Sequence, residues 1–282
     1  MPRAAIIIPH RDDPIRLERC LDALLPIARD IEICVVDNGS TSDLTSLRDR
    51  FRAVQFVDEP IPGAAAARNR GVKATSAPLL FFLDCDCVPD VGWTTRALSA
   101  AAKADIVGGR VSVFAEAGSK LSGAAAFEIV FAFDNRRYVE TMNFSVTANL
   151  LTTRAVFDAV GPFRDGVSED VDWCHRAVAA GYRLSYDPEL AVSHPARCDW
   201  AALSGKWRRT TQEAFGLSRR HPARWLAKAL VLPVSALVHA PRVIRSRELS
   251  SLRSRGLGLV TLFGIRCARS FWMVRLALGR AI

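Results

Sequence analysis

Short apolar runs alternate with segments of helical periodicity through the first hundred residues. The strand-like runs are residues 4–8, 32–36, 55–57 and 79–83. Apolar residues between 17 and 25 and small residues between 63 and 71 recur instead at helical spacing. An unbroken apolar run such as 79–83 is typical of a strand that is buried on both faces. The alternation therefore predicts a doubly wound α/β sheet whose strands are covered by helices.

The second half of the chain contains the same kinds of element in a less regular order. Strands are expected at residues 106–114, 143–151 and 190–193. Helices are expected at 127–138, at 153–160 and from residue 169 to the helix-ending Gly181. With 282 residues, half of them hydrophobic, the chain can bury a full core in one large α/β domain and still carry an appendage.

The positive charge of the chain is concentrated in residues 201–282. This segment has 16 Lys and Arg against two Glu, a net charge of +14, whereas residues 1–200 have 22 against 27, a net of −5, and the two sum to +9. Apolar blocks at 226–232 and 256–263 alternate with its arginines, and neither offers the roughly 20 charge-free residues of a membrane span. We expect a domain at 1–200 and a basic amphipathic helical tail at 201–282 that lies on an anionic membrane surface. The alternative is a packed helical subdomain with a solvated basic face.

The cysteine pattern indicates a reduced, intracellular protein. The seven cysteines are an odd number, and the chain shows no secretory signal peptide. A structural zinc site would need a second pair at ligand spacing besides Cys85 and Cys87, but the other five cysteines are scattered singly. The chain has no Gly-x-x-x-x-Gly-Lys and no Gly-x-Gly-x-x-Gly sequence, so phosphate charge must be met by a metal ion and by arginine.

Two carboxylates directly follow the most apolar strand, in the sequence Asp84-Cys85-Asp86. In open α/β sheets, ligands bind beyond the carboxyl ends of the strands. Two carboxylates at such a position repel each other unless a cation or a donor-rich ligand holds them. Magnesium or manganese, bound by one or two carboxylates and by substrate phosphates, fits this pattern best. The alternative is a strand-end turn with two solvated aspartates.

Three further positions carry candidate chemistry. Asp37 ends the strand at 32–36, where it can contact a nucleotide base or ribose. Glu169, Asp170 and Asp172 begin a helix, where interaction with the helix dipole would by itself explain carboxylates. His194 follows a strand end and could complete a metal shell, although a lone histidine is more often structural.

Taken in order, these segments resemble the inverting family-2 glycosyltransferases of the GT-A fold. The matching segments are Ile6 to Pro9, Val35 to Asp43, Gly63 to Gly71, Asp84 to Asp86, Gly161 to Phe163, Ser168 to Asp172 and Lys206 to Arg209. The resemblance covers roughly residues 4 to 215. It implies a GT-A-type doubly wound mixed sheet, a nucleotide-diphosphate sugar donor, an acceptor hydroxyl and a divalent metal cofactor, magnesium or manganese.

The resemblance also assigns roles to individual residues. By it, Asp170 is the general base, with Glu169 beside it at the catalytic centre. Asp86 is the direct metal ligand, assisted by Asp84 and His194. The residues implied to bind the nucleotide sugar are Pro9, His10, Arg11, Asp12, Asp37, Arg68, Asp84 and Cys85.

One departure from the family pattern concerns the nucleotide base. Members usually have Tyr-Asn shortly after the first-strand proline, whereas this chain has His10-Arg11-Asp12. A guanidinium can stack on the face of a ring, so Arg11 is expected to replace the missing aromatic side chain. Uracil is the first candidate base, and guanine and thymine remain open.

The leading hypothesis is a sugar transferase at the inner, cytoplasmic face of the cell membrane, to which it attaches peripherally. Its acceptor is a lipid-linked sugar or a growing surface glycan, and no nucleic-acid partner is expected. A sugar nucleotidyltransferase is a second hypothesis, but those enzymes usually have a Gly-rich loop with Lys or Arg near the first strand, which is missing here. A third is a non-catalytic protein that binds membrane or nucleic acid through the basic tail. The presence of Asp84, Asp86 and Asp170 argues against it.

Overall fold

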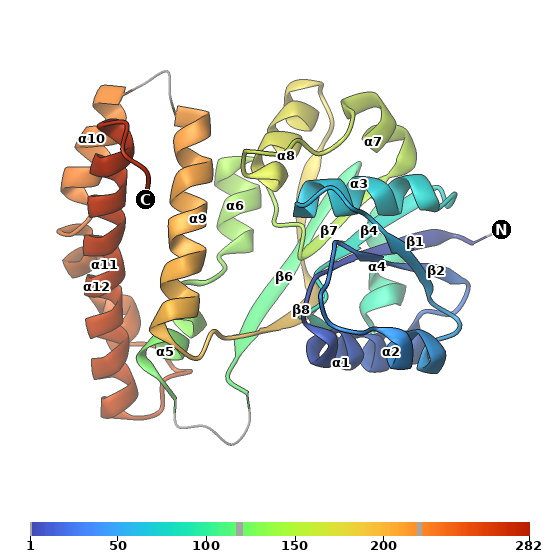
Figure 1. Cartoon of the computed structure of the whole chain (residues 1–282), viewed down its shortest axis with the longest axis horizontal. Coiled ribbons are helices and arrows are strands. Elements are labelled where there is room, and N and C mark those ends of the chain that lie inside the picture. Colours follow the sequence, from blue (N-terminus) through green and yellow to red (C-terminus); the bar gives the residue numbers. More distant parts are fainter. Residues whose placement is uncertain (1, 117–120, 219–221) are drawn as a thin grey trace. The chain divides into compact units, whose positions relative to one another are not determined.

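The computed structural model describes residues 2–116, 121–218 and 222–282 (Figure 1). The chain divides into two compact units. Unit 1 consists of Met1–Ser112, Asp134–Asp165 and Glu169–His194, and unit 2 of Val113–Phe133, Gly166–Ser168 and Pro195–Ile282. Residues 113–133, which the sequence analysis placed with the N-terminal domain, therefore group with the C-terminal segment.

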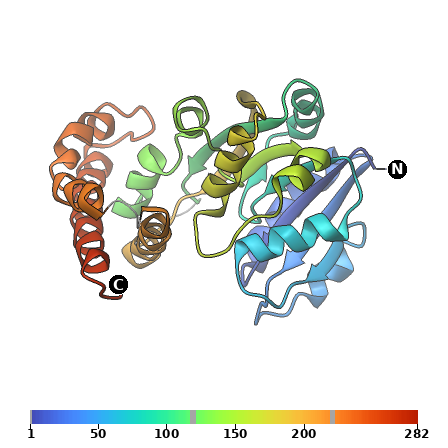
Figure 2. The same ribbon diagram turned by 90° about the horizontal axis from the view of Figure 1, so that it is seen from above.

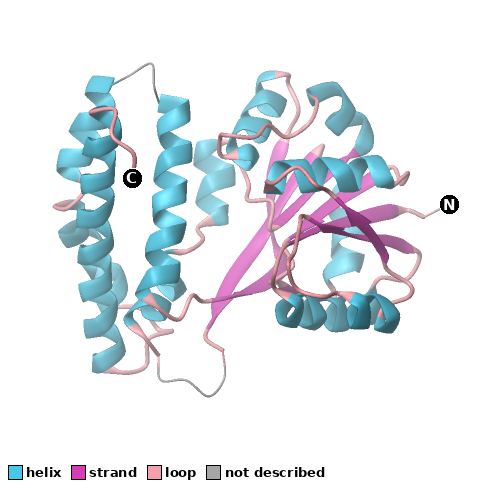
Figure 3. Cartoon of the chain, in the orientation of Figure 1, coloured by secondary structure: helices cyan, strands magenta, loops and turns pink. Residues whose placement is uncertain are grey.

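The strands form one mixed eight-stranded sheet among the described residues, in the order β3-β2-β1-β4-β7-β6-β8-β5 (Figure 3). Their bounds are β1 Ala4–His10, β2 Ile31–Asp37, β3 Gln55–Asp58, β4 Leu79–Leu83, β5 Val88–Pro89, β6 Ile106–Phe114, β7 Asn149–Thr153 and β8 Leu184–Pro195. Strands β1 to β4 are parallel, whereas β7 runs antiparallel to β4 and β6. The mixed sheet and the strands at 79–83 and 106–114 are confirmed.

Helices cover both faces of this sheet. Those of unit 1 are α1 Pro14–Leu24, the 3-10 helix η1 Leu25–Ile27, α2 Thr45–Arg50, α3 Ala64–Ala74, α4 Trp93–Ala101, α6 Asn135–Met142, α7 Arg154–Val160 and α8 Glu169–Ala179. Helices α3, α7 and α8 cover one face (Figure 2). Ile7 and Phe82 share a core with these helices. On the other face, the ring of Phe81 meets the Trp93 ring of α4 edge-on, with centroids 5.9 Å apart. Alternating side chains of β4 thus pack against different helices, as expected for a strand covered on both sides.

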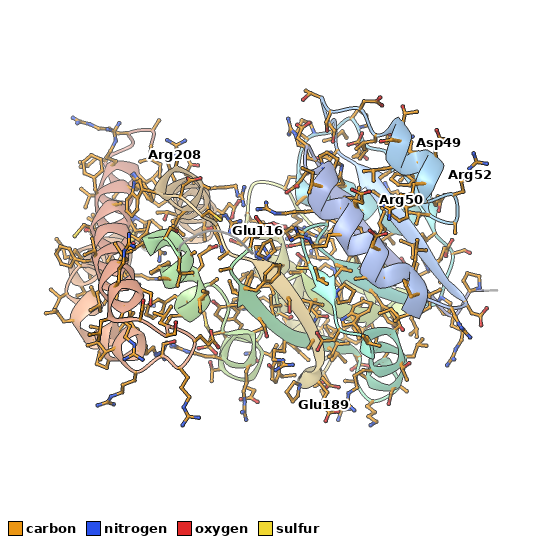
Figure 4. The ribbon with its side chains drawn as sticks, turned by 90° about the horizontal axis from the view of Figure 1, so that it is seen from below. Asp49, Arg50, Arg52, Glu116, Glu189 and Arg208 are labelled. Carbon is orange, nitrogen blue, oxygen red and sulfur yellow. The ribbon has the colours of Figure 1, made fainter. Side chains whose placement is uncertain are left out.

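Two short-range contacts fix helices of unit 1 in place. A Cβ atom at Gly71 of α3 would lie 2.5 Å from Cγ2 of Ile7, so only glycine permits this close approach of α3 to β1. On the surface, Arg50 reaches from α2 to α1 (Figure 4), where its Nη2 lies 2.7 Å from Oδ1 of Asp22. The first contact positions α3, which carries Arg68 at the candidate site.

Three predicted elements were wrong in extent, and one of them is the strand expected at 190–193, which is the longer β8 and includes His194. The single helix expected at 127–138 is two helices, α5 Gly123–Phe131 and α6, separated by residues 132–134. Asp134 and Asn135 favour a helix start over a helix interior, and the buried Asn135 amide donates instead to the Gly109 carbonyl at 2.6 Å. The strand expected at 143–151 begins only at Asn149, because Asn143 ends α6 in the left-handed conformation.

Unit 2 is helical apart from the strand ends that enter it. Its helices are α5, α9 Trp200–Ser218, α10 Pro222–Val231, α11 Ser235–Ile244 and α12 Leu252–Ala277. Helix α12 packs against each of the other four (Figure 1). At the α5–α9 contact, the buried Glu128 carboxylate accepts from Arg197 Nη1 and from Lys206 Nζ, both at 3.0 Å. Burial alone would raise the pKa of Glu128, but these two cations hold it below its usual value.

The C-terminal helices are longer and more apolar than the sequence analysis expected. By length and composition, α12 could cross a membrane, and 28% of its most apolar window is buried within the protein. Helices α10 and α11 pass the same test only as a pair, and they meet at an angle of 51°. A mostly buried helix of a water-soluble protein can meet these criteria as well, so they establish composition and not insertion.

Candidate active site

The carboxyl ends of three parallel strands bring the predicted donor-binding residues to one edge of the sheet. In the register of the sheet, Pro9 and His10 of β1 lie beside Val36 and Asp37 of β2. Strand β4 flanks β1 on its other side and ends at Leu83, so the Asp84 turn follows at the same edge. This is the edge at which open α/β sheets bind their ligands.

The Asp84-Cys85-Asp86 segment is a tight turn between β4 and β5. The Cys87 amide donates to the Asp84 carbonyl at 3.0 Å, and the three side chains are half-buried. Burial, reinforced by the negative charges of Asp86 and Asp84, raises the pKa of the Cys85 thiol well above its usual value. Cys85 therefore stays a neutral thiol at physiological pH.

Arg68 joins this turn to the acidic start of α8. Its Nη2 donates to Asp84 Oδ1 and its Nη1 donates to Glu169 Oε1, each at 2.7 Å. The side chain is almost fully buried, with 4% of the residue exposed. Burial disfavours the guanidinium cation, but Asp84 and Glu169 outweigh this effect and raise the pKa of Arg68. Two segments that are 85 residues apart in the sequence thereby meet at one cation.

Asp170 differs from its neighbours because its side chain forms no ion pair with any residue that the structure describes. Burial, together with the negative charge of Glu169, raises the pKa of Asp170 to about 7. The Val171 amide, which donates to Asp170 Oδ1 at 2.8 Å, and the more distant Arg68 oppose the rise. Asp172 instead accepts from Arg176 Nε at 2.9 Å, an ion pair within α8. The α8 carboxylates are thus not equivalent, and Asp170 is the one suited to accept a proton near neutral pH.

His194 and Asp86 form the second close pair of the site. His194 Nε2 lies 3.0 Å from Asp86 Oδ2, and both side chains are largely buried. An imidazole nitrogen and a carboxylate oxygen at this separation suit a shared divalent cation such as Mn²⁺. Among the described residues, no cluster of three or more His, Cys, Asp and Glu could hold a metal ion. A bound ion would therefore need ligands from its substrate, as Mg²⁺ and Mn²⁺ commonly do at phosphates.

The β1 end shows which predicted donor-binding residues are available to a ligand. His10 is buried, accepts from the Asp13 amide through Nε2 at 3.2 Å, and faces Ser40 Oγ through Nδ1 at 3.3 Å. Asp12 Oδ1 accepts from the Thr41 amide at 2.6 Å, and this and other hydrogen bonds lower the pKa of Asp12. These two side chains hold the loop after β2, whereas the Arg11 guanidinium is exposed.

Two asparagines organise the site without having been predicted to do so. Asn38 donates to the Glu59 and Ile61 carbonyls at 3.0 and 2.7 Å and accepts from the Gly63 amide at 2.7 Å. It thus shapes the loop that precedes α3. Asn69 exchanges two hydrogen bonds with the backbone of Phe163, at 2.9 and 3.0 Å. Their only signal in the sequence is that each adjoins a predicted site residue, Asp37 or Arg68.

The chain is similar over most of its length to known glycosyltransferases. It is 29% identical to glycosyltransferase AglE of Haloferax volcanii over 98% of its own length and 94% of that protein. It is 27% identical, over 94% of its length, to the pre-mycofactocin glycosyltransferase of Mycobacterium tuberculosis, of which it spans only 57%.

The solved structures to which the chain is similar confirm the GT-A fold. The mannosyltransferase PcManGT from Pyrobaculum calidifontis, in complex with GDP-Man and Mn²⁺, matches with a TM-score of 0.63 and 17% identity, over 98% of this chain and 87% of that one. S. aureus TarS 1–349 matches with a TM-score of 0.54 and 14% identity, over 99% and 92%. At these identities the likeness establishes the fold alone.

The family assignment comes from the sequence of the N-terminal half. Residues 5–163 match the family described as Glycosyl transferase family 2, which is more than half of the chain. The matched region includes β1, β2, Arg68 and the Asp84 turn. This protein therefore belongs to glycosyl transferase family 2 and is a glycosyltransferase that uses a nucleotide-sugar donor.

Proposed function

We propose that this protein is an inverting, metal-dependent glycosyltransferase that moves a sugar from a nucleotide diphosphate to an acceptor hydroxyl at a membrane surface. The observation that carries the proposal is the guanidinium of Arg68, which contacts both Asp84 and Glu169. Through it, the turn at the carboxyl end of β4 and the start of α8 belong to one site. That site combines carboxylates for a donor with a potential base for an acceptor.

Asp86 and His194 are the side chains that would hold the divalent ion. Their 3.0 Å separation and their oxygen and nitrogen donors fit Mn²⁺ or Mg²⁺. The fold likeness to a mannosyltransferase solved with Mn²⁺ supports this assignment. When bound, the ion supplies positive charge that stabilises the departing diphosphate. Asp84, which already accepts from Arg68, would serve the ribose side of the donor and assist the metal site.

Asp170 is the proposed general base. Its carboxylate takes the proton of the acceptor hydroxyl while that oxygen attacks the anomeric carbon from the face opposite the diphosphate, which inverts the configuration. A pKa of about 7 suits this task, since the group is largely ionised just above neutral pH and still binds a proton effectively. Glu169 contributes through its charge, which raises the pKa of Asp170, while its carboxylate is held by Arg68.

The nucleotide would lie against the ends of β1 and β2. Asp37 is proposed to contact the base, with Pro9 and the exposed Arg11 stacking beside it. His10 and Asp12 are already hydrogen-bonded within the protein, so their proposed role is to hold the loop that forms the pocket. Cys85, a neutral thiol, would contact the donor through its backbone or through packing.

Unit 2 is proposed to contact the inner, cytoplasmic face of an anionic membrane, where the acceptor is a lipid-linked sugar or a surface glycan. Among the described residues, 17 large apolar side chains are exposed, and 13 of these belong to unit 2. Five occur within nine residues around the α10–α11 bend: Leu230, Val231, Val234, Leu237 and Val238. Exposed apolar area of this density, flanked by arginines, is typical of a membrane-surface helix.

A donor screen tests the enzymatic proposal. Thermal shifts with a panel of nucleotide sugars, in Mn²⁺ and in chelator, should identify a donor that stabilises the protein more strongly with metal than in chelator. Product analysis by NMR should then show an anomeric configuration opposite to that of the donor. A product that retains the donor configuration would contradict the proposed role of Asp170, and equal stabilisation in chelator would contradict the metal site.

A further inference from the structure

Three basic side chains meet where α9, α10 and α12 pack together in unit 2. Ser270 Oγ on α12 donates to the Ala229 carbonyl on α10 at 2.8 Å. Arg269 precedes Ser270 and Lys228 precedes Ala229, so these two cations lie at the same level of the helix pair. Arg266 lies three residues before Arg269, on the same face of α12. The guanidinium carbon of Arg269 in turn lies 4.2 Å from the ring centroid of Trp207 on α9.

Two of these positive charges, those of Lys228 and Arg266, are only weakly neutralised by the residues that the structure describes. Lys228 and Arg266 make no ion pair or hydrogen bond through their side chains with any residue that the structure describes. Residues 201–282 contain only two acidic side chains, Glu213 and Glu248, against 16 Lys and Arg. Burial lowers the pKa of Arg266, and burial together with Arg269 and Arg266 lowers the pKa of Lys228. Cations in such surroundings favour an anion that replaces the lost hydration.

Unused hydrogen-bond donors accompany the charge. Nε of Arg266 is shut off from solvent and has no hydrogen-bond partner among the described residues, and the same is true of Nε1 of Trp207. A buried donor without a partner lowers the stability of the folded protein, because it loses its hydrogen bonds to water and does not replace them. A cluster that concentrates positive charge and unmet donors is poorly explained by stability, since uncharged side chains at these positions would avoid both costs.

We propose that Lys228, Arg266 and Arg269 bind the phosphate group of a lipid. Arginine fits phosphate oxygens through its planar pair of donors, and Lys228, an exposed residue, adds a point charge. The phosphate belongs either to a phospholipid headgroup of the bilayer or to the carrier of a lipid-linked acceptor. This inference rests on the proposed membrane contact of unit 2, and it names the group on the membrane that unit 2 recognises.

The test compares Arg266→Gln with Arg253→Gln in the full chain. Arg253 is exposed on the same helix, 13 residues or about 20 Å before Arg266, so the two variants lose equal charge at different places. Farnesyl diphosphate, with farnesol as the phosphate-free control, represents the lipid carrier. Vesicles of phosphatidylglycerol in phosphatidylcholine represent the bilayer. All binding is measured in chelator, so that the donor site with its metal does not capture the diphosphate.

We expect Arg266→Gln to weaken binding to at least one of the two probes by about tenfold or more, while Arg253→Gln changes it little. Whichever probe is affected identifies the source of the phosphate. The melting temperature of Arg266→Gln without ligand should equal or exceed that of the wild type, because an unpaired cation has been removed; a purely structural arginine would predict a clear drop. Equal effects of the two substitutions, or no effect on either probe, would overturn the proposal.

A further variant separates this inference from the catalytic one. Asp86→Ala should lose metal-dependent donor binding and keep the binding of lipid phosphate, because Asp86 belongs to unit 1 and the basic cluster to unit 2. If lipid phosphate binds normally while no nucleotide sugar binds even to the wild type, the proposed enzymatic function fails and the phosphate site stands. If the wild type binds a nucleotide sugar but does not bind lipid phosphate, the phosphate site is rejected and the enzymatic function stands.

Discussion

Nη1 of Arg68 lies 2.7 Å from Oε1 of Glu169, a contact that joins α3 to the first turn of α8. The other end of the guanidinium lies 2.7 Å from Asp84, so one cation balances two carboxylates in a largely buried site. Removing the cation leaves both carboxylates partly buried and unpaired. We expect Arg68→Met to lower the free energy of unfolding by about 3–5 kcal/mol, measured by urea denaturation.

The matched control for this prediction is Arg48→Met. Arg48 also pairs with a carboxylate at 2.7 Å, that of Asp58, but both side chains are exposed. An exposed pair contributes about 0–1 kcal/mol, so this variant should lose little stability. Similar losses in the two variants would show that burial does not set the strength of the Arg68 contacts.

The pKa of Asp170 leads to a prediction about the pH dependence of both rate and stability. The rate of sugar transfer at saturating donor should fall as the pH drops through about 7, because the protonated Asp170 carboxyl cannot accept a proton. Asp170→Asn should slow transfer by roughly 10²- to 10⁴-fold while donor affinity is retained. If Asp170 only complemented the helix dipole, the same variant would lose about 0.3–1 kcal/mol of stability and keep its turnover.

The stability of the wild type should depend on pH in the opposite sense. The folded protein holds the proton of Asp170 up to a pKa of about 7, whereas an unfolded chain releases it near 4. Between these values the folded state binds more protons, so this group makes the free energy of unfolding decrease as pH rises. In Asp170→Asn that decrease should be absent between pH 4 and 7. If the difference in free energy of unfolding between the wild type and Asp170→Asn does not change with pH, the raised pKa of Asp170 is contradicted.

The sequence predicted the strand ends at this edge of the sheet well because their signal is local. The apolar run 79–83 followed by Asp84 and Asp86 specifies a buried strand and a polar end within eight residues. Parallel pairing then brings Pro9 and Asp37 to the same edge, as the structure confirms. The order of strands and helices was sufficient for this part of the fold.

Contacts between distant segments could not be predicted from pattern alone. Nothing in the sequence around Arg68 indicates that it pairs with Glu169, 101 residues later. The same holds for residues 123–131, whose helix packs on α12 within unit 2. The sequence also did not indicate that His10 and Asp12 hydrogen-bond to Ser40 and Thr41 in the loop after β2. Periodicity reports which face is buried, not which partner covers it.

The pair of Asp86 and His194 leads to a prediction about metal. Asp86→Ala and His194→Ala should each weaken donor binding in Mn²⁺ by about tenfold or more, and neither should change donor binding measured in chelator. Asp90→Ala is the control, since Asp90 follows in the same segment and its carboxylate is exposed. Titration calorimetry measures donor binding by the wild type and the three variants, each in Mn²⁺ and in chelator. An effect of His194→Ala that persists in chelator would assign His194 to the structure of the protein and not to the metal.

The exposed apolar residues around the α10–α11 bend lead to a prediction about membrane binding. Leu237 and Val238 are 71% and 74% exposed, and burial of a side chain of this size in lipid contributes about 1.5–3 kcal/mol. The double variant Leu237→Glu, Val238→Glu removes both contributions and adds charge that anionic lipid repels. Its affinity for vesicles containing phosphatidylglycerol should fall at least about 100-fold in a sedimentation assay. Val91→Glu is the matched control, because Val91 is 86% exposed in unit 1.

Wild-type binding should also weaken as salt is raised, since exposed charges are screened within about 8 Å at physiological ionic strength. If the wild type binds neutral and anionic vesicles equally, the arginines of unit 2 do not direct the contact; if the double variant binds as tightly as Val91→Glu, the bend does not touch the membrane.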